Sequence, residues 1–227
     1  QGPRSFQIMK EASGGKIDET MKYFHSGFFE IDDQNVYVSR TGWTGELGFE
    51  IYSMGFATDC PRLWDFLIQV GTPHGMVFGS ISGMEIRRIE AGILDNGTDF
   101  DVSMTPFEAG LGAFVDLDKE NYVGRTAVLE AHNGTRIFGI KSPETTPIYQ
   151  GEVLNCSKHV GEITAGAWSP FLNAGIGYVR FNEPGDWAGK NLKMKCANGE
   201  LATCEIVNLP FYDPKKLIPR GLEKTIP

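Results

Sequence analysis

Hydrophobic residues recur at helical spacing in three segments of the first half of the chain. The pattern predicts helices over residues 5–12 (SFQIMKEA), 60–71 (CPRLWDFLIQVG) and 81–93 (ISGMEIRRIEAGI). Each segment has apolar side chains three or four positions apart and a glycine at or near its end, as amphipathic helices of globular proteins do.

Alternating residues predict strands between these helices. FFEIDDQNVYVSR, residues 28–40, is typical of a hairpin with a polar turn at residues 32–35. The stretch SRTGWTGELGFEIYS, residues 39–53, continues it with a run rich in glycine and threonine and then a strand over residues 48–53. The first part of the chain is therefore expected to mix helices with a small sheet.

The second half of the chain has a different pattern. Residues 93–125 are rich in loop-forming residues, and residues 136–209 hold several short alternating runs separated by Gly, Pro and Asn. Short strands with frequent turns favour an all-β barrel or sandwich. We therefore predict an α+β chain in two domains, residues 1–131 and a β domain over residues 132–227.

Glu50 is the first candidate binding residue because it stands within the apolar run GFEIYS. Alternation places Gly48, Glu50 and Tyr52 on one face of the strand. A carboxylate there can accept two parallel N–H bonds from a guanidine-like edge, such as that of a pterin or a guanine. The alternative is a strand glutamate that faces solvent or pairs with Arg40 or Arg88.

The helix over residues 81–93 carries the next candidates. Arg87 and Glu90 are three residues apart and are expected to pair on the helix surface. Arg88 projects from another side, where it either lines a cleft that suits a carboxylate-bearing ligand or stays on a surface.

Acidic residues in the long loop do not match a calcium-loop pattern, and solvated turn or helix-capping roles are expected for them: Asp95, Asp99, Asp101 and Glu108.

Composition excludes several classes of function. The formal net charge of −8 and the absence of a Lys/Arg stripe argue against nucleic-acid binding. No apolar run is long enough for a membrane span, so we expect no membrane partner and a cytoplasmic location. The four cysteines lack metal-ligand spacing, so we expect reduced thiols and no metal site. The residues alone identify no catalytic group.

Several ordered motifs nevertheless resemble one family. SRTGWTGELGFEIY, RRIEAGILDNGTDFDVSMTPFEAGLGAFVDLDKENYVGRTAV and GEITAGAWSPFLNAGIGYVRF resemble, in that order, the motifs of the glycine-cleavage T-protein (aminomethyltransferase) family. The resemblance extends over essentially all 227 residues. It implies part of a folate-binding region followed by a C-terminal β-barrel.

The family resemblance implies a function and assigns site residues. Members bind tetrahydrofolate and transfer to it a one-carbon unit from an amine, or a methyl group from a sulfonium compound. Matched by motif, Glu50 corresponds to the glutamate that grips the pterin ring, and Trp43 falls at an aromatic position of the same loop. The expected ligands are tetrahydrofolate and a small-molecule one-carbon donor, and Arg88 stays a candidate for the folate.

Two departures from the family pattern matter. True T-proteins have a folate-binding arginine four residues before the arginine of the R-[LI]-E-A-G motif, and this chain has Met84 there. The family's catalytic aspartate belongs to a region that precedes the matched motifs, and no residue here corresponds to it. The resemblance thus implies the C-terminal portion of a longer polypeptide, whose missing N-terminal part would complete the site.

The donor and two alternative functions stay open. TDFD and PFEAG favour the dimethylsulfoniopropionate demethylase branch, whereas TGELGFE keeps the T-protein loop. Transfer from a lipoyl carrier would need a docking patch for a carrier protein, and none is evident. One alternative is a non-catalytic folate-binding relative of the iron–sulfur maintenance type, although ENYVGRTAV lacks the cysteine of its motif. The other is the folate domain of a flavin-linked methylamine dehydrogenase.

Overall fold

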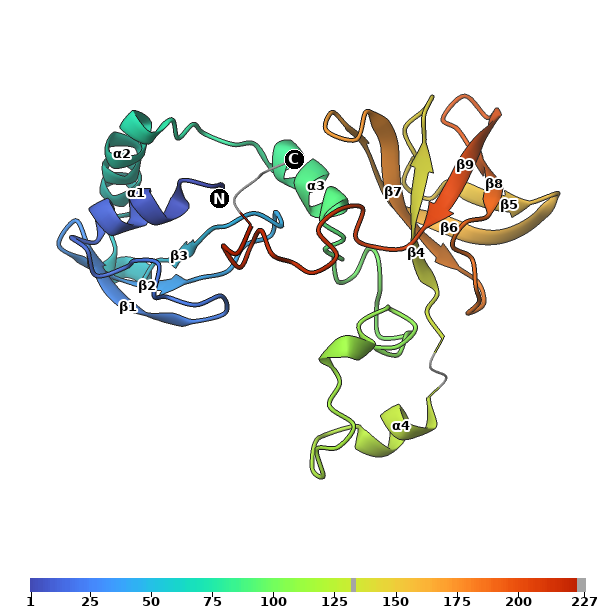
Figure 1. Cartoon of the computed structure of the whole chain (residues 1–227), viewed down its shortest axis with the longest axis horizontal. Coiled ribbons are helices and arrows are strands. Elements are labelled where there is room, and N and C mark those ends of the chain that lie inside the picture. The colour runs from blue at the N-terminus through green and yellow to red at the C-terminus, as the bar shows by residue number, and fades with distance from the viewer. Residues whose placement is uncertain (132–133, 224–227) are drawn as a thin grey trace. The chain divides into compact units, whose positions relative to one another are not determined.

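The computed structural model describes residues 1–131 and 134–223 of the chain (Figure 1). These residues form two compact units, each described by itself below. Unit 1 comprises Gln1–Arg87 and the segment that begins at Lys215, and unit 2 comprises Arg88–Pro214.

Unit 1 is a three-stranded antiparallel sheet with helices packed on one face. The sheet has the order β1-β2-β3, and its elements are β1 (Ser26–Ile31), β2 (Gln34–Ser39), β3 (Glu50–Tyr52), α1 (Ser5–Ala12) and α2 (Cys60–Gly71). Strand β2 alternates between buried and more exposed residues, as a sheet covered on one side requires. Met9 of α1 and Leu63 of α2 are buried in one cluster with Val38.

The predicted helices and hairpin of unit 1 are confirmed. Helices α1 and α2 cover the predicted residues 5–12 and 60–71. Helix α2 begins where Asp59 accepts a hydrogen bond from the backbone N of Arg62 at 3.1 Å, a normal N-cap contact. The hairpin turn is tight: Asp32 and Asp33 both have positive φ, 51° and 57°, between paired Ile31 and Gln34.

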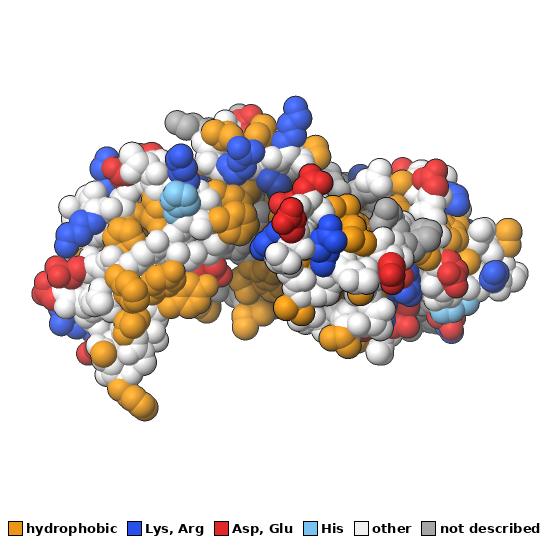
Figure 2. Space-filling view, turned by 90° about the horizontal axis from the view of Figure 1, so that it is seen from below, with side chains coloured by type: hydrophobic (Ala, Val, Ile, Leu, Met, Phe, Trp, Pro, Cys, Tyr) orange, Lys and Arg blue, Asp and Glu red, His pale blue; other side chains and the backbone are white. Residues whose placement is uncertain are grey.

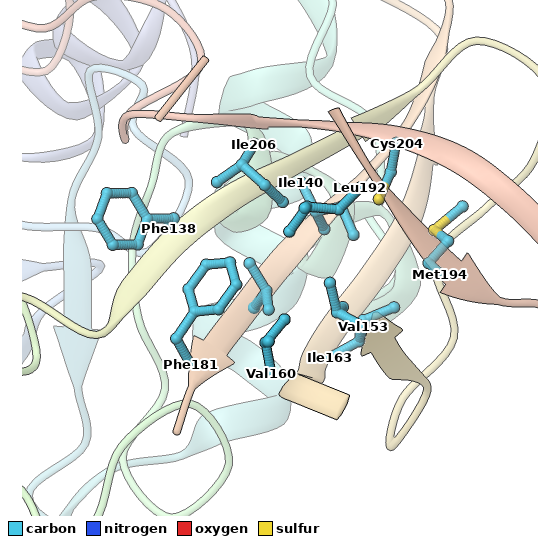
Figure 3. Close-up of a cluster of buried hydrophobic side chains, with 11 residues drawn as sticks. Phe138, Ile140, Val153, Val160, Ile163, Phe181, Leu192, Met194, Cys204 and Ile206 are labelled. Atoms are coloured by element: carbon cyan, nitrogen blue, oxygen red, sulfur yellow. The ribbon is translucent and has the colours of Figure 1, made fainter. Parts of the chain in front are cut away.

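Unit 2 is built around a closed β-barrel. Its six strands follow the order β4-β7-β6-β5-β8-β9, and their bounds are Ile137–Ser142 (β4), Glu152–Asn155 (β5), Lys158–Ser169 (β6), Ala174–Phe181 (β7), Asn191–Lys195 (β8) and Leu201–Val207 (β9). Closure leaves no unpaired sheet edge. The barrel interior is filled by apolar side chains, among them Ile140, Ile163 and Ile206, which are fully buried (Figure 3).

The loop region before the barrel belongs to the same unit. Helix α3 (Ile81–Glu90) crosses from one unit to the other in sequence, and α4 (Arg125–Glu130) lies near the end of the loop region. The backbone N of Arg136 donates to the carbonyl of Glu108 at 2.7 Å, and Thr164 of β6 donates to Asp99 at 2.7 Å. These bonds hold the loop against the barrel.

The α+β class and the barrel are confirmed, with three refinements. The barrel is closed and is not a sandwich, and β5 is a strand that the sequence did not reveal. Helix α3 ends at Glu90, before the predicted residue 93, because Gly92 turns the chain with φ of +69°. The predicted domain boundary falls at residues 132–133, which lie outside the described residues, and the domain limits stay a prediction.

Other expectations concern the membrane and the thiols. Among the described residues, no helix has the length and apolar character needed to cross a membrane. The cysteines are free thiols: Cys60 and Cys156 are exposed, Cys196 is half-buried and Cys204 is buried. Burial raises the pKa of the Cys204 thiol to about 12, so it behaves as a core side chain.

Candidate functional site

Glu50 lies at the start of β3, on the sheet face opposite the helices. Its Cα pairs with that of Ser39, and Tyr52 pairs with Tyr37. Since side chains alternate along a strand, these four residues share one face, while Ile51 packs on the other side with the buried cluster of unit 1. Hydrophobic side chains, drawn in orange, gather on the face of this unit that Figure 2 shows at the left.

The loop between β2 and β3 depends on glycine for a steric reason. The side-chain amide of Gln1 lies in this loop, where it donates to the carbonyl of Phe49 at 3.0 Å and accepts from Thr44 at 3.0 Å. A Cβ atom on Gly42 or Gly48 would lie 2.0 or 2.2 Å from the Gln1 side-chain oxygen. The glycines of the quoted stretch therefore let an amide approach the backbone closely.

The hydrogen-bond partners of Glu50 are hydroxyl groups. Thr41 Oγ1 donates to Glu50 Oε2, and the Tyr52 hydroxyl donates to the same oxygen at 3.3 Å. Among the described residues no hydrogen bond reaches Glu50 Oε1. The carboxylate is half-buried, so it is held in place with one oxygen still able to accept.

The pairing of Glu50 with Arg40, one of the alternatives from the sequence, is not found among the described residues of unit 1. Arg40 is 1% exposed and donates from Nη1 to the carbonyl of Gly48 at 3.3 Å. Its guanidinium lies 4.7 Å from the ring centre of Phe6 and 5.4 Å from that of Phe49. Burial lowers the pKa of Arg40. Arg40 thus supports the loop from inside the unit.

The charge of Glu50 acts on two nearby phenols. It raises the pKa of Tyr52, for which the Glu50 charge is the main cause. The pKa of Tyr23 is also raised, mainly by burial, with a smaller contribution from Glu50 and an opposing one from Arg40. A negative carboxylate among hydroxyls and rings attracts an N–H donor and repels an anion.

Trp43, the second predicted site residue, lies in the same loop and is half-buried. It lies seven positions before Glu50 in the sequence. A role for Trp43 in lining a ligand channel stays a prediction.

Arg88, the third, is in unit 2 and is 2% exposed. Its Nη1 donates to Asp99 Oδ2 at 2.7 Å and to the carbonyl of Ile93 at 3.2 Å. Asp99 is 0% exposed and also accepts from the backbone N of Asp95 at 2.7 Å. The expectation of a solvated Asp99 was wrong, because the guanidinium, Thr164 and a backbone N–H offset the cost of burying its charge.

The neighbouring helix residues have partners from distant parts of their own units. Arg87 donates to Glu46 in the glycine-rich loop of unit 1, and Glu90 accepts from Ser169 at 2.5 Å in the barrel unit. A surface pair between Arg87 and Glu90 was the expectation from their spacing. Arg87 and Glu46 are 41 positions apart, and Glu90 and Ser169 are 79 positions apart, so a rule based on local spacing detects neither contact.

The remaining loop carboxylates do have turn roles. Asp101 accepts from the backbone N of Ser103 at 2.8 Å, and Glu108 accepts from that of Thr105 at 2.9 Å. Thr105 in turn accepts from the backbone N of Glu108, which completes a reciprocal capping arrangement. Within the described ranges, no group of three or more His, Cys, Asp and Glu side chains is placed to hold a metal ion.

A mostly apolar cavity of unit 1 lies away from Glu50. This cavity, of about 730 Å³, lies on the helix-covered side of the sheet and is lined by residues that include Ile8, Phe49, Ile51, Trp64 and Phe78. Neither Glu50 nor Trp43 lines it. We place the candidate site at Glu50 because a fixed carboxylate can recognise a polar ring edge, whereas the described residues that line this cavity are mostly apolar.

Two family models match consecutive parts of the chain. The model of the GCVT N-terminal domain matches residues 1–119, and that of the glycine cleavage T-protein C-terminal barrel domain matches residues 136–213. The second match covers the strands of the closed barrel.

Curated relatives agree with these matches. The chain is 32% identical to an aminomethyltransferase of Alkaliphilus oremlandii over 216 residues, which are 93% of this chain and 58% of the relative. It is 29% identical to a trimethylamine-oxide aldolase of Ruegeria pomeroyi over 236 residues, which are 97% of this chain and 30% of that protein. The chain thus spans little more than half the length of the aminomethyltransferases it matches.

A solved structure shares the fold. The glycine cleavage system aminomethyltransferase T from Bartonella henselae superposes with a TM-score of 0.77 at 23% identity, over 93% of this chain and 58% of that chain. The ordered motifs, the barrel and the two family models lead to one conclusion: the chain belongs to the glycine cleavage T-protein family.

Proposed function

We propose that this chain is part of an enzyme that transfers a one-carbon group from a small amine or sulfonium donor to tetrahydrofolate. Family membership supports one-carbon transfer to folate in general. The observation that carries the proposal is Glu50, a half-buried carboxylate with one oxygen held by hydroxyl groups and the other available as an acceptor.

The residues around Glu50 fit the ring of a folate. The pterin ring of tetrahydrofolate has adjacent N–H groups on its pyrimidine edge, and a fixed carboxylate accepts from such an edge with good geometry. The Tyr52 ring flanks the carboxylate on the same face of the sheet. Trp43, in the adjoining loop, is proposed as a further contact of the ring.

We do not extend the proposal to Arg88. Its guanidinium donates to Asp99 inside unit 2 and is almost fully buried, so a structural role accounts for it.

The proposed reaction needs orientation more than acid–base groups. N5 of tetrahydrofolate would supply the nucleophile. For methyl transfer, a C–S or C–N bond of the donor breaks, its electron pair stays with the sulfur or nitrogen, a C–N5 bond forms, and the proton of N5 is lost to solvent. The protein residues hold the folate ring so that N5 is in line with the donor carbon, and such positioning accounts for a large part of the acceleration.

The first test is tetrahydrofolate binding by calorimetry. It uses the longest natural polypeptide that contains this chain, because the chain spans 58% of the first aminomethyltransferase. Glu50→Ala is expected to weaken binding at least tenfold, about 1.4 kcal/mol or more, through loss of a charged hydrogen-bond acceptor. Glu30→Ala is the matched control, since Glu30 lies on β1 and its ion-pair partner among the described residues is the surface residue Lys16, at 3.7 Å.

Each outcome decides the matter. Binding by the parent protein and by Glu30→Ala, with weak binding by Glu50→Ala, supports the site. Absence of binding by the parent protein, or equal binding by Glu50→Ala, refutes it.

The chemical class of the one-carbon donor is tested separately from folate binding. Relatives named as aminomethyltransferases favour an aminomethyl donor, and the relative named as a trimethylamine-oxide aldolase favours a methylated amine. Mass spectrometry of the folate product distinguishes them, because the first donor yields a methylene derivative and methyl transfer yields a 5-methyl derivative. If neither product forms with any amine or sulfonium donor while folate still binds, the chain is a non-transferase relative.

A further inference from the structure

The carboxylate of Glu50 is held unevenly. Both of its protein hydrogen bonds reach Oε2, one from Thr41 and one from Tyr52, and none in the described part of the chain reaches Oε1. Thr41 comes from the loop directly after β2, whereas Tyr52 is two positions along the strand from Glu50 itself. The two donors therefore belong to different segments and can be altered separately.

The direction of the proton follows from the chemistry of the groups. An ionised carboxylate only accepts, so the single hydroxyl proton of Thr41 goes to Glu50. Thr41 Oγ1 also lies 2.9 Å from Ser39 Oγ. The charge on the acceptor strengthens the bond from Thr41 to Glu50.

The number of free acceptor positions on the Glu50 carboxylate limits how a ligand can bind. A carboxylate oxygen accepts about two good hydrogen bonds, and a whole carboxylate about four. Oε2 already has two donors, while Oε1 has none among the residues that the structure describes. A ligand edge with two parallel N–H groups needs one acceptor position on each oxygen. Such an edge therefore requires one hydroxyl to leave Oε2.

Tyr52 is the donor that can leave at low cost. Its hydroxyl lies 3.3 Å from Oε2, near the long end of the range for a hydrogen bond. The side chain is 49% exposed, so its phenol can donate to water when the ligand arrives. Thr41 is half-buried and has no such exchange open to it without breaking its contact with Ser39.

We infer that Thr41 is a positioning residue for Glu50 and that Tyr52 is a displaceable donor whose place on Oε2 is taken by the ligand. This inference rests on the proposed function, since the ligand is the pterin edge of tetrahydrofolate. In the ligand-free protein the two hydroxyls hold the carboxylate in one orientation. In the bound protein Thr41 stays, Tyr52 turns to water, and both carboxylate oxygens accept from the ring.

The two hydroxyls then have opposite effects on binding. Thr41→Val keeps the shape of the side chain and removes its donor, and tetrahydrofolate binding is expected to weaken about tenfold. Thr41→Ser restores the hydroxyl and is expected to restore binding. Tyr52→Phe removes the donor that the ligand must displace, and binding is expected to tighten by about threefold.

Tyr37→Phe is the matched control for the tyrosine. The Tyr37 hydroxyl lies 2.6 Å from Ser26 Oγ, and its ring lies 6.2 Å from that of Tyr52. Removing that hydroxyl leaves Glu50 and its partners untouched, so tetrahydrofolate affinity is expected to stay unchanged.

A ligand-free measurement separates this inference from the proposed function. Three-bond NMR couplings report whether the Glu50 side chain keeps one rotamer or averages over several. The parent protein, Thr41→Ser and Tyr52→Phe are expected to show one rotamer, and Thr41→Val to show averaging. This measurement needs no folate, so it stays decisive even if tetrahydrofolate does not bind.

The experiment uses the longest natural polypeptide that contains the chain, with both readouts on each variant. Weaker binding and averaging in Thr41→Val alone, with tighter binding in Tyr52→Phe, support the inference. Unchanged couplings in Thr41→Val overturn the positioning role of Thr41. Weaker binding by Tyr52→Phe overturns the displacement of Tyr52. A parent protein that shows one rotamer but binds no tetrahydrofolate refutes the proposed function and the displacement, and leaves the positioning of Glu50 by Thr41 supported.

Discussion

Arg88 donates to Asp99 across 2.7 Å within unit 2, and the two side chains are 2% and 0% exposed. The pair joins helix α3 to the loop that follows it. Asp99 also accepts from Thr164 of β6, so the same carboxylate connects the loop to the barrel. One buried carboxylate therefore organises three segments of the unit.

The first prediction concerns this carboxylate. Asp99→Ala removes a carboxylate from the buried guanidinium of Arg88, and the free energy of unfolding is expected to fall by about 3–5 kcal/mol. Urea denaturation measures the change. Thr164→Val, which removes one donor and leaves the ion pair intact, is the control and is expected to cost about 1–3 kcal/mol. An equal, small loss in both variants would show that the ion pair does not hold the loop.

The second prediction concerns glycines of the barrel. A Cβ atom on Gly166 of β6 would lie 1.9 Å from the carbonyl oxygen of Pro147, since the segment at Pro147 lies directly over this strand. Backbone cannot give way as a flexible side chain does. Gly166→Ala is therefore expected to destabilise the protein by about 1–3 kcal/mol or more, measured as a lower midpoint of thermal unfolding.

Gly83 provides the comparison for Gly166. It lies within α3, and an added Cβ would meet Ser80 Oγ at 3.6 Å, an ordinary contact. Gly83→Ala is expected to stabilise the protein by about 0.5–1 kcal/mol through helix propensity. Equal effects of the two substitutions would mean that close packing over β6 is not what requires glycine.

The local parts of this structure were predictable from sequence because the signals are local. Helices α1 and α2 follow from apolar spacing and a cap, and strand β7 matches the alternating run of residues 174–181. Strand β5, Glu152–Asn155, has only four residues and a single fully buried side chain, so periodicity had too little to detect. Its pairing with β6 and β8 is what makes it a strand.

The candidate site was predictable only in part. Glu50 stood out because a carboxylate within an apolar run needs an explanation. The sequence indicates only that Thr41 belongs to a turn-rich loop. Its contact with Glu50 depends on how the loop between β2 and β3 folds back. In the sequence, Asp99 is one of several carboxylates of the long loop. Its burial depends on hydrogen bonds from Arg88 and from Thr164, which lies 65 residues away in the sequence. Sequence spacing does not encode such contacts.

The third prediction concerns the ionisation of Tyr52. The negative charge of Glu50 raises the pKa of this phenol above its ordinary value of 10.0, because phenolate formation next to a carboxylate is unfavourable. Glu50→Gln removes the charge, so the pKa of Tyr52 is expected to fall. Ultraviolet absorbance of phenolate, titrated with pH and compared with a Tyr52→Phe sample to isolate this residue, measures the shift.

Glu30→Gln is the control for the phenol titration. Glu30 lies on β1 of the same sheet and does not contribute to the pKa of Tyr52. A Tyr52 titration that moves equally in both variants would show a general charge effect and not a contact with Glu50.

The fourth prediction concerns acid stability and Glu108. Its pKa is lowered chiefly by the hydrogen bond from the backbone N of Thr105, with a further contribution from the charge of Arg136. A carboxyl group whose pKa is lower in the folded state stabilises the protein when it is ionised. This stabilisation is complete above the ordinary pKa of 4.5 and is lost as pH falls through the lower, folded value.

Glu108→Gln tests this directly, because the amide oxygen can still accept from Thr105 but has no charge to lose. The free energy of unfolding, measured by urea denaturation from pH 7 down through the range below 4.5, is expected to fall less steeply in Glu108→Gln than in the parent protein. At pH 7 the variant is expected to be less stable by about 0.5–2 kcal/mol, the usual cost of weakening a capping contact.

Glu144→Gln is the control, because Glu144 is an exposed carboxylate on the loop after β4, and it is expected to leave the slope of stability against pH unchanged. Parallel pH profiles for the parent protein and Glu108→Gln would show that the reciprocal bonds of Thr105 and Glu108 do not depend on the charge, and the capping contact would then stabilise the turn by its geometry alone.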